Sequence, residues 1–117
     1  MSKQLPQPVE IYMDSLNTND TTVIDVCMAK DAHIHDSGEN NHFNGIEAIK
    51  EWRGKSIGYE LKSNVIEVEY KHGIIIVSSL TSGIFPGSPQ LFYYFFTVAN
   101  DLITNIEIVP GAENYKQ

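Results

Sequence analysis

Apolar residues near the start of the chain recur with the spacing of an amphipathic helix. One helical stripe is formed by Leu5, Val9, Tyr12, Met13 and Leu16. Pro6 and Pro8 suit the first turn of such a helix, because a missing backbone N–H costs little there. The turn formers at residues 17–20 (NTND) end it. The pattern therefore predicts a first helix that buries one face.

Two more helices are predicted before residue 60. A short one is capped by Asp20 or Thr21 and has a buried side made of Ile24, Cys27 and Met28. The next begins at a capping-box pattern formed by Asn44 and Glu47, and it ends at Gly54 or Gly58. Its inner face comprises Ile46, Ile49 and Trp52, with Arg53 and Ile57 as further candidates.

The remaining pattern is that of strands. Residues 32–37 alternate as one short strand, and four longer strands are expected at 60–70, 74–85, 91–99 and 102–109. A sheet of this kind must hide one apolar face, and the helices are the only available cover. Gly83 and Pro86 favour bending of a long strand. We therefore expect an α+β protein in which three helices pack on a strongly curved, mixed or antiparallel sheet.

Length and composition narrow the class. The 117 residues suffice for one domain, spanning 1–117, and no segment is apolar enough to span a bilayer. The N-terminal sequence MSKQLPQP lacks the apolar region of a secretory signal. Cys27 is the only cysteine, so a reducing cytoplasm is the expected location. A lone cysteine on an apolar helix face is ordinarily a packing residue.

The net charge of −7 argues against some classes of partner and does not indicate any particular one. Eight basic residues are scattered without a cluster, which argues against nucleic acids and acidic membrane surfaces. The chain also has no nucleophile motif, glycine-rich phosphate loop or cofactor signature, so no cofactor is expected.

The strand at 91–98 carries large apolar side chains on both faces. Phe92, Tyr94, Phe96 and Val98 alternate with Leu91, Tyr93 and Phe95. One set packs against the helices or lines a cavity, and core packing is as good an interpretation of any single ring as ligand binding. The other set leaves a patch too apolar for a monomer, which predicts a homodimer through the sheet face.

Two polar residues fall on apolar faces. Tyr12 lies on the inner helical stripe, and Asp36 shares strand parity with Ala32 and Ile34. Burial would raise the pKa of this carboxyl, as suits a general base, and a nearby phenol could stabilise developing oxyanion charge. The alternative is structural: Asp36 caps backbone N–H groups at the strand end, and Tyr12 bonds to a carbonyl.

Three sequence blocks resemble the nuclear transport factor 2-like superfamily, in particular SnoaL-like polyketide cyclases and ketosteroid isomerase. They are PVEIYMDSLNTND, AHIHDSGENNHFNGIEAIKEW and SGIFPGSPQLFYYFFTVANDLITNIEI. The resemblance covers residues 5–109 and implies a cone-shaped (cystatin-like) fold around a pocket for a small apolar molecule. It aligns Tyr12 with the oxyanion-hole tyrosine of the isomerase and Asp36 with its base. Phe92 replaces the family's second oxyanion donor, which argues against steroid isomerisation by the full triad.

The same resemblance implies further pocket residues. It puts Asn105 and Glu107 on the cavity side, with Glu107 as a secondary catalytic candidate, whereas local hydrophobicity favours Leu102, Ile106 and Ile108 as the buried set. The rings expected to shape the pocket are Phe43, Trp52, Phe85, Phe92, Tyr94 and Phe96.

Histidines form one more group. His33 and His35 share a strand face and His42 follows, but Asp36 points the other way. A metal site needs three or four converging ligands, so we expect surface or dimer-interface histidines and no metal. Two functions stay open at this stage. One is cofactor-independent isomerisation or cyclisation of an apolar carbonyl compound, and the other is non-catalytic ligand binding or protein interaction.

Overall fold

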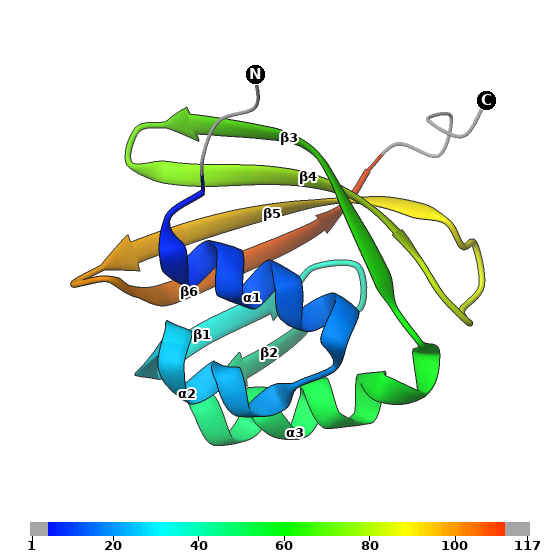
Figure 1. Ribbon diagram of the computed structural model, residues 1–117, viewed down its shortest axis with the longest axis horizontal. Coiled ribbons are helices and arrows are strands. Elements are labelled where there is room, and N and C mark those ends of the chain that lie inside the picture. The colour runs from blue at the N-terminus through cyan, green and yellow to red at the C-terminus, as the bar shows by residue number, and fades with distance from the viewer. Residues whose placement is uncertain (1–4, 112–117) are drawn as a thin grey trace.

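The computed structural model describes residues 5–111 as a six-stranded sheet with three helices on one face (Figure 1). The helices are α1 (Gln7–Thr18), α2 (Ile24–Cys27) and α3 (Ile46–Ser56). A 3₁₀ turn, η1 (Thr21–Val23), precedes α2, and another, η2 (Ile57–Tyr59), follows α3. The strands are β1 (Met28–Asp36), β2 (Asn41–Asn44), β3 (Lys62–Lys71), β4 (Ile74–Ser82), β5 (Gln90–Ala99) and β6 (Leu102–Pro110).

The sheet is mixed, with strand order β2-β1-β6-β5-β4-β3. All neighbours are antiparallel except β1 and β6, the second and third strands of the sheet, which run parallel. This pairing places Asp36 beside Ile108, and His33 and His35 beside Asn105 and Glu107. The last strand therefore lies directly against the first third of the chain.

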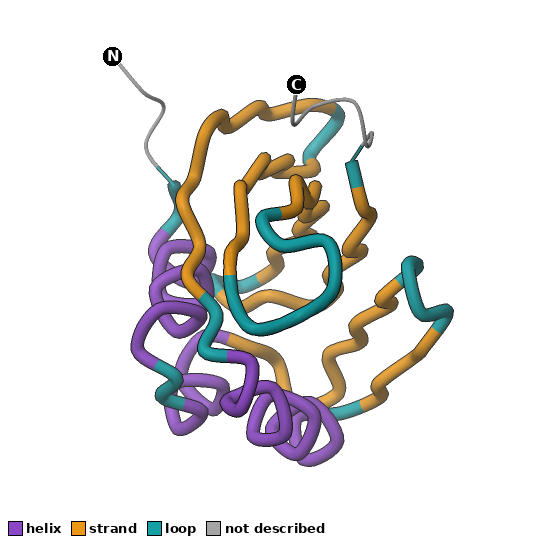
Figure 2. Tube along the Cα trace, turned by 90° about the vertical axis from the view of Figure 1, so that its right-hand side faces the viewer, coloured by secondary structure: helices purple, strands orange, loops and turns teal. Residues whose placement is uncertain are grey.

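The sheet curves around the interior. Ladder irregularities fall in β1 between Met28 and His33, in β3 between Val65 and Glu67, and in β5 between Thr97 and Val98. Bulges of this kind bend a strand and increase its twist. In Figure 2 the strands wrap around the interior while the helices lie along one side of it. The expected α+β cone, with three helices on a curved sheet, is confirmed.

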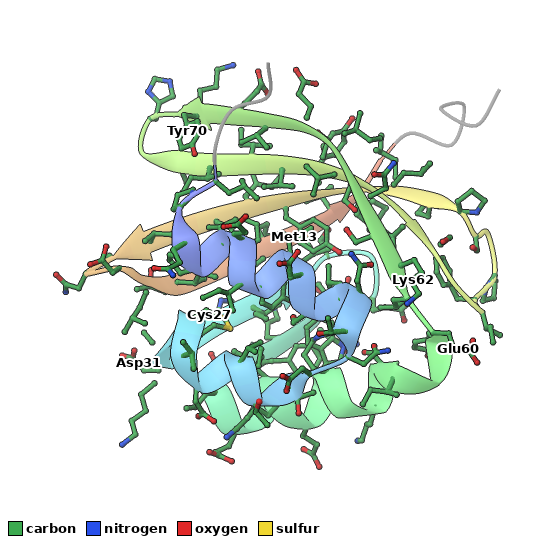
Figure 3. All side chains as sticks on the ribbon, viewed as in Figure 1. Met13, Cys27, Asp31, Glu60, Lys62 and Tyr70 are labelled. Atoms are coloured by element: carbon green, nitrogen blue, oxygen red, sulfur yellow. The ribbon has the colours of Figure 1, made fainter. Side chains whose placement is uncertain are left out.

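The core fills the space between the helices and the concave face of the sheet. Met13 of α1 lies in this layer, and the sulfur of Cys27 lies between α1 and α2 (Figure 3). The largest fully buried side chains are Tyr12, Phe96, Ile24, Ile34, Ile49, Ile103 and Ile106. Asp20 rather than Thr21 caps η1, accepting a hydrogen bond from the backbone N–H of Thr22 at 3.1 Å. Within residues 5–111, no helix has the length and apolar character needed to cross a membrane.

Local signals misplaced the start of α3. Asn44 belongs to β2, where it pairs with His33, and Gly45 occupies the N-cap with φ 87° and no side-chain cap. The capping box was therefore a wrong interpretation, because strand pairing uses the residue that would have capped the helix. The polar run at residues 39–42 hid β2, which is exposed apart from Phe43.

Other boundaries also shift. β1 begins four residues earlier than expected, and β4 ends at Ser82 rather than Phe85. Neither Gly54 nor Gly58 ends its helix. Helical backbone continues past both glycines because the side chains of Arg53 and Ser56 pack inward. The helical segment ends at Glu60, whose φ is 52°.

Candidate functional site

Tyr12 places a hydroxyl in the interior without a partner. The side chain is fully buried on α1 and packs edge-on against Phe96, with ring centroids 5.8 Å apart. Among the described residues, no group hydrogen-bonds to its hydroxyl oxygen. Burial raises the pKa of Tyr12 to about 12, partly opposed by the positive charge of Arg53. The phenol is therefore a neutral donor that has no acceptor within residues 5–111.

Asp36 lies at the end of β1 on the same side of the sheet. Its pairing partner Ile108 and its neighbour Ile34 both face the core, so Asp36 shares the inner face with them. Partial burial raises the pKa of this carboxyl, and the charge of Glu39 adds to the effect. The backbone N–H groups of Glu39 and Gly38 act in the opposite direction without cancelling it.

The two groups share one electrostatic environment. The negative charge of Asp36 raises the pKa of Tyr12 and that of Tyr94 on β5. Burial is the largest cause of the raised pKa of Tyr94. The expected inward placement of a carboxylate and a phenol is thus what the structure has. The structural alternative for Asp36 is also supported, because the backbone N–H groups of Gly38 and Glu39 act on its carboxylate.

A set of hydroxyl groups, not foreseen from the sequence, lines the inner face of the sheet beside Tyr94. Ser63 Oγ and Ser79 Oγ are 2.5 Å apart, Ser79 Oγ and Thr81 Oγ1 are 3.2 Å apart, and the Thr81 side chain lowers the pKa of Tyr94 against the larger effect of burial. We call Ser63, Ser79, Thr81 and Tyr94 the hydroxyl row. Its signal in the sequence was the parity of β4, in which Ser79 and Thr81 continue the buried series of Ile75 and Val77.

Arg53 was only a candidate for the inner face of its helix, and the structure buries it there. The side chain is 3 % exposed, and its guanidinium Nη2 donates to the carbonyl of Ser15 at 3.5 Å. The signal was its position four residues after Ile49, although a charged residue on an apolar stripe is usually solvated.

The expected pocket rings divide into two groups. Tyr94 and Phe96 are buried in the core, whereas Phe43, Trp52, Phe85 and Phe92 are half-buried. Phe43 and Trp52 stack with ring centroids 4.7 Å apart, joining β2 to α3. Phe92 packs against the core and offers no hydrogen-bond donor, as the sequence comparison with the isomerase indicated.

Asn105 and Glu107 lie elsewhere. Both point to the outer face of the sheet, where Asn105 Oδ1 is 2.9 Å from His33 Nδ1 and Glu107 Oε2 is 2.5 Å from His35 Nδ1. This corrects the expectation that they face the cavity. Ile106 and Ile108 take the inner positions because burying them removes more apolar surface from water.

The three histidines gather on this outer face. His42 stacks on His35 with ring centroids 4.1 Å apart, and its Nδ1 is 2.9 Å from His33 Nε2. The hydrogen bond to Glu107 raises the pKa of His35. Across the part of the chain that the structure describes, no three His, Cys, Asp or Glu side chains are arranged to hold a metal ion.

Comparison with known proteins places this geometry in a family. No protein-family model matches the sequence, and no curated protein matches it either. Among solved structures, a candidate polyketide cyclase from Sinorhizobium meliloti is 30% identical, with a TM-score of 0.81 over 90% of this chain and 95% of that one.

Two further structures share the fold at lower identity. A candidate SnoaL-like polyketide cyclase from Jannaschia sp. CCS1 is 17% identical, with a TM-score of 0.71 over 94% of this chain and 91% of that one. A candidate ketosteroid isomerase from Kribbella flavida is 12% identical, with a TM-score of 0.78 over 92% and 77%. The curved sheet, the three covering helices and this similarity show that the chain belongs to the nuclear transport factor 2-like superfamily, among its SnoaL-like and ketosteroid isomerase-like members.

Proposed function

We propose that residues 1–117 form one domain that binds a small apolar carbonyl compound between α1, α3 and the sheet. There it moves a proton on that compound without a cofactor, in an isomerisation or an aldol-type cyclisation. The observation that carries this proposal is the buried, unpartnered Tyr12 hydroxyl on the same side of the sheet as Asp36, a carboxyl with a raised pKa. Similarity to a candidate polyketide cyclase supports the reaction class, although this fold hosts many activities.

Each group has one role in the proposed step. The Asp36 carboxylate takes a proton from a carbon next to the carbonyl, so a C–H bond breaks and an O–H bond forms. The released electron pair moves onto the carbonyl oxygen, and the Tyr12 O–H donates to that oxygen. In an isomerisation Asp36 returns the proton to a different carbon. In a cyclisation the enolate carbon bonds to a second carbonyl of the same molecule, and that oxygen receives the proton.

A small enone tests the mechanism. Conversion of 3-cyclohexen-1-one into its conjugated 2-isomer moves one proton and is followed by ultraviolet absorbance. Asp36→Asn should lower the catalysed rate by about 10²- to 10⁴-fold, the usual contribution of a positioned base. Because burial raises the pKa of Asp36, the rate should increase with pH around a midpoint above the ordinary value of 3.8.

Asp31→Asn is the matched control. It makes the same change at an exposed carboxylate on β1, and it should leave the rate within a factor of about two. Equal rates for the Asp36→Asn variant and the unmodified protein would exclude the proposed base.

A second candidate function is non-catalytic binding of the same class of ligand or interaction with another protein. It is favoured by the Gly38 and Glu39 N–H groups around the Asp36 carboxylate and by Phe92, which cannot donate to an oxyanion. Ligand binding that survives Asp36→Asn, with no catalysed proton transfer by the unmodified protein, would support this alternative.

We further propose that two copies pair through the outer face of the sheet, in the cytoplasm. The half-buried apolar side chains on that face are Ile76, Leu80, Tyr93, Phe95 and Val109. They form one patch because β4, β5 and β6 are neighbours, with Ile76 opposite Phe95 and Tyr93 opposite Val109. The free, buried thiol of Cys27 is compatible with a reducing compartment.

A further inference from the structure

Arg53 brings a positive charge into an otherwise apolar layer. It lies on the inner face of α3 together with Ile49 and Ser56, and only 3 % of its surface is exposed. Arginine stays protonated at any physiological pH, so this site holds a permanent charge away from water. Buried charges are ordinarily paired with an opposite charge, because their desolvation is otherwise uncompensated.

The protein itself supplies little compensation. The guanidinium group has five N–H donors, and its hydrogen bond to the Ser15 carbonyl is long, at 3.5 Å. That carbonyl also accepts a 2.8 Å hydrogen bond from the backbone N–H of Asn19. Within residues 5–111 no carboxylate oxygen comes within 4.0 Å of Arg53. Among the described residues, the buried cation therefore has no anionic partner.

The phenol of Tyr12 lies close to this contact. Arg53 meets α1 at Ser15, one turn after Tyr12, and the Ser15 hydroxyl donates to the Tyr12 carbonyl at 2.6 Å. The charge of Arg53 also lowers the pKa of Tyr12 and that of Tyr94, against the larger effect of burial. The Tyr12 hydroxyl has no hydrogen-bond partner among the described residues. Asp36 acts on the same two phenols with the opposite sign but makes no ion pair with Arg53. The buried cation thus contacts α1 one turn from a phenol that has no partner among the described residues, and Asp36 lies on the inner face of the same sheet.

Partly buried rings packed against the core favour an organic anion over an inorganic one. Trp52, next to Arg53 in sequence, stacks on Phe43 and is half-buried, as is Phe92 of β5. These rings offer apolar surface that an inorganic ion could not use. The chain carries a net charge of −7, so no long-range attraction draws anions to it, and recognition would depend on this local cation.

We propose that the ligand is a small monocarboxylic acid that also carries a carbonyl group, with its carboxylate paired to Arg53 and its carbonyl oxygen bonded to Tyr12. This inference rests on the proposed function for the identity of the site, and it adds the charge of the ligand. A guanidinium that pairs with a carboxylate in two parallel hydrogen bonds would also fix which carbon faces Asp36.

The charge of the ligand is tested with two probes of the same shape, cyclohexanecarboxylate and cyclohexanecarboxamide, titrated by calorimetry at pH 7. The acid should bind the unmodified protein at least tenfold more tightly than the amide. Arg53→Met, which keeps a long apolar side chain, should abolish this preference. Lys55→Met removes the same charge from the exposed face of α3 and should keep it. Inorganic phosphate should not compete with the acid at equal concentration.

The stability of the unligated protein gives a second measurement. If Arg53 awaits an anion from the ligand, Arg53→Met should unfold at the same temperature as the unmodified protein or higher, because an uncompensated buried charge is removed. A lower unfolding temperature would mean that the protein already satisfies the guanidinium, and it would overturn the inference.

The binding data separate this inference from the proposed function. Equal affinity for acid and amide, or no binding of either, would overturn the inference even if Asp36→Asn abolishes proton transfer. If the preference for the acid depends on Arg53 but Asp36→Asn leaves turnover unchanged, the inference is supported and the proposed base is excluded.

Discussion

At the scale of single residues, the interior is defined by polar groups with unequal access to partners. Tyr12 and Tyr94 are both buried phenols close to Phe96, with ring centroids 5.8 and 6.1 Å from it. The Thr81 side chain of the hydroxyl row acts on the Tyr94 hydroxyl and lowers its pKa, whereas the Tyr12 hydroxyl has no hydrogen-bond partner among the described residues. A buried hydroxyl without a partner keeps its full desolvation cost, so the two phenols should respond differently to loss of the oxygen.

We predict that Tyr12→Phe raises the free energy of unfolding by about 1 kcal/mol while lowering the catalysed rate by about 10²-fold, because it removes an unsatisfied buried group that the reaction uses. Urea unfolding followed by circular dichroism measures the first effect, and the enone assay measures the second.

Tyr94→Phe is the matched control for that prediction. It removes the hydroxyl on which Thr81 acts and should lower the free energy of unfolding by about 1 kcal/mol, since a buried hydroxyl with a polar neighbour is lost. Equal destabilisation by the two changes would show that the Tyr12 hydroxyl is satisfied in the folded protein.

At the scale of elements, the segment that follows β4 is tied closely to η2. The backbone N–H of Ile84 donates to the Tyr59 carbonyl at 2.6 Å. A Cβ added at Gly83 would lie 2.6 Å from that same carbonyl oxygen, closer than real Cβ atoms come. Gly83 is therefore required by the approach of two backbones, and this contact joins the end of α3 to the sheet. We expected Gly83 to favour bending of a strand. In the structure it allows the segment after β4 to contact η2.

We predict that Gly83→Ala lowers the free energy of unfolding by about 1 to 3 kcal/mol, because backbone atoms must move apart to admit one methyl group. Gly54→Ala is the control in the interior of α3, where an added Cβ would meet nothing within 4 Å. It should raise stability by up to about 1 kcal/mol through helix propensity. A Gly83→Ala variant as stable as the unmodified protein would mean that η2 and β4 are not held together in this way.

At the scale of the whole molecule, the two faces of the sheet have different tasks. The inner face meets the helices and carries the candidate site, and the outer face carries the histidines beside a half-buried apolar patch. Phe95 lies within this patch, opposite Ile76 on β4 and Glu107 on β6. A positive charge at this position would disfavour an apolar interface while pairing with Glu107 inside one copy.

We predict that the unmodified protein is a dimer and that Phe95→Lys makes it a monomer with its secondary structure intact, as measured by light scattering after size exclusion and by circular dichroism. Val26→Lys places the same charge on α2, at a side chain that is 65% exposed, and should leave the dimer unchanged. A monomeric unmodified protein, or a dimeric Phe95→Lys variant, would exclude this interface.

Much of the fold could be predicted because local periodicity records which side of an element is buried. The stripe of α1, the hairpins at residues 72–73 and 100–101, and the inward parity of Asp36 all follow from spacing within a few neighbouring residues. Left-handed backbone at His72, Gly73, Asn100 and Asp101 is the conformation that such tight turns require. The hydrophobic pattern also had the right answer for Glu107, where alignment with the isomerase did not.

Other features depended on partners distant in sequence. The pairing that defines β2 joins Asn41–Asn44 to β1, and its polar composition gave no sign of a strand. Arg53 is buried because the inner face of α3, on which it lies, packs against the rest of the fold. Burial is unusual for this residue type.

The spacing of apolar and polar residues was enough to predict the class of fold and the inward direction of Tyr12 and Asp36, because this alternation is a local property of each helix or strand. Contacts between elements distant in sequence determined which groups face them. The parallel contact of β1 with β6 sent Glu107 to the outer face, and the packing of α3 against β1 and α2 carried Arg53 to the Ser15 carbonyl of α1. These outcomes depend on which distant elements share a layer, and the spacing within one segment carries no record of that choice.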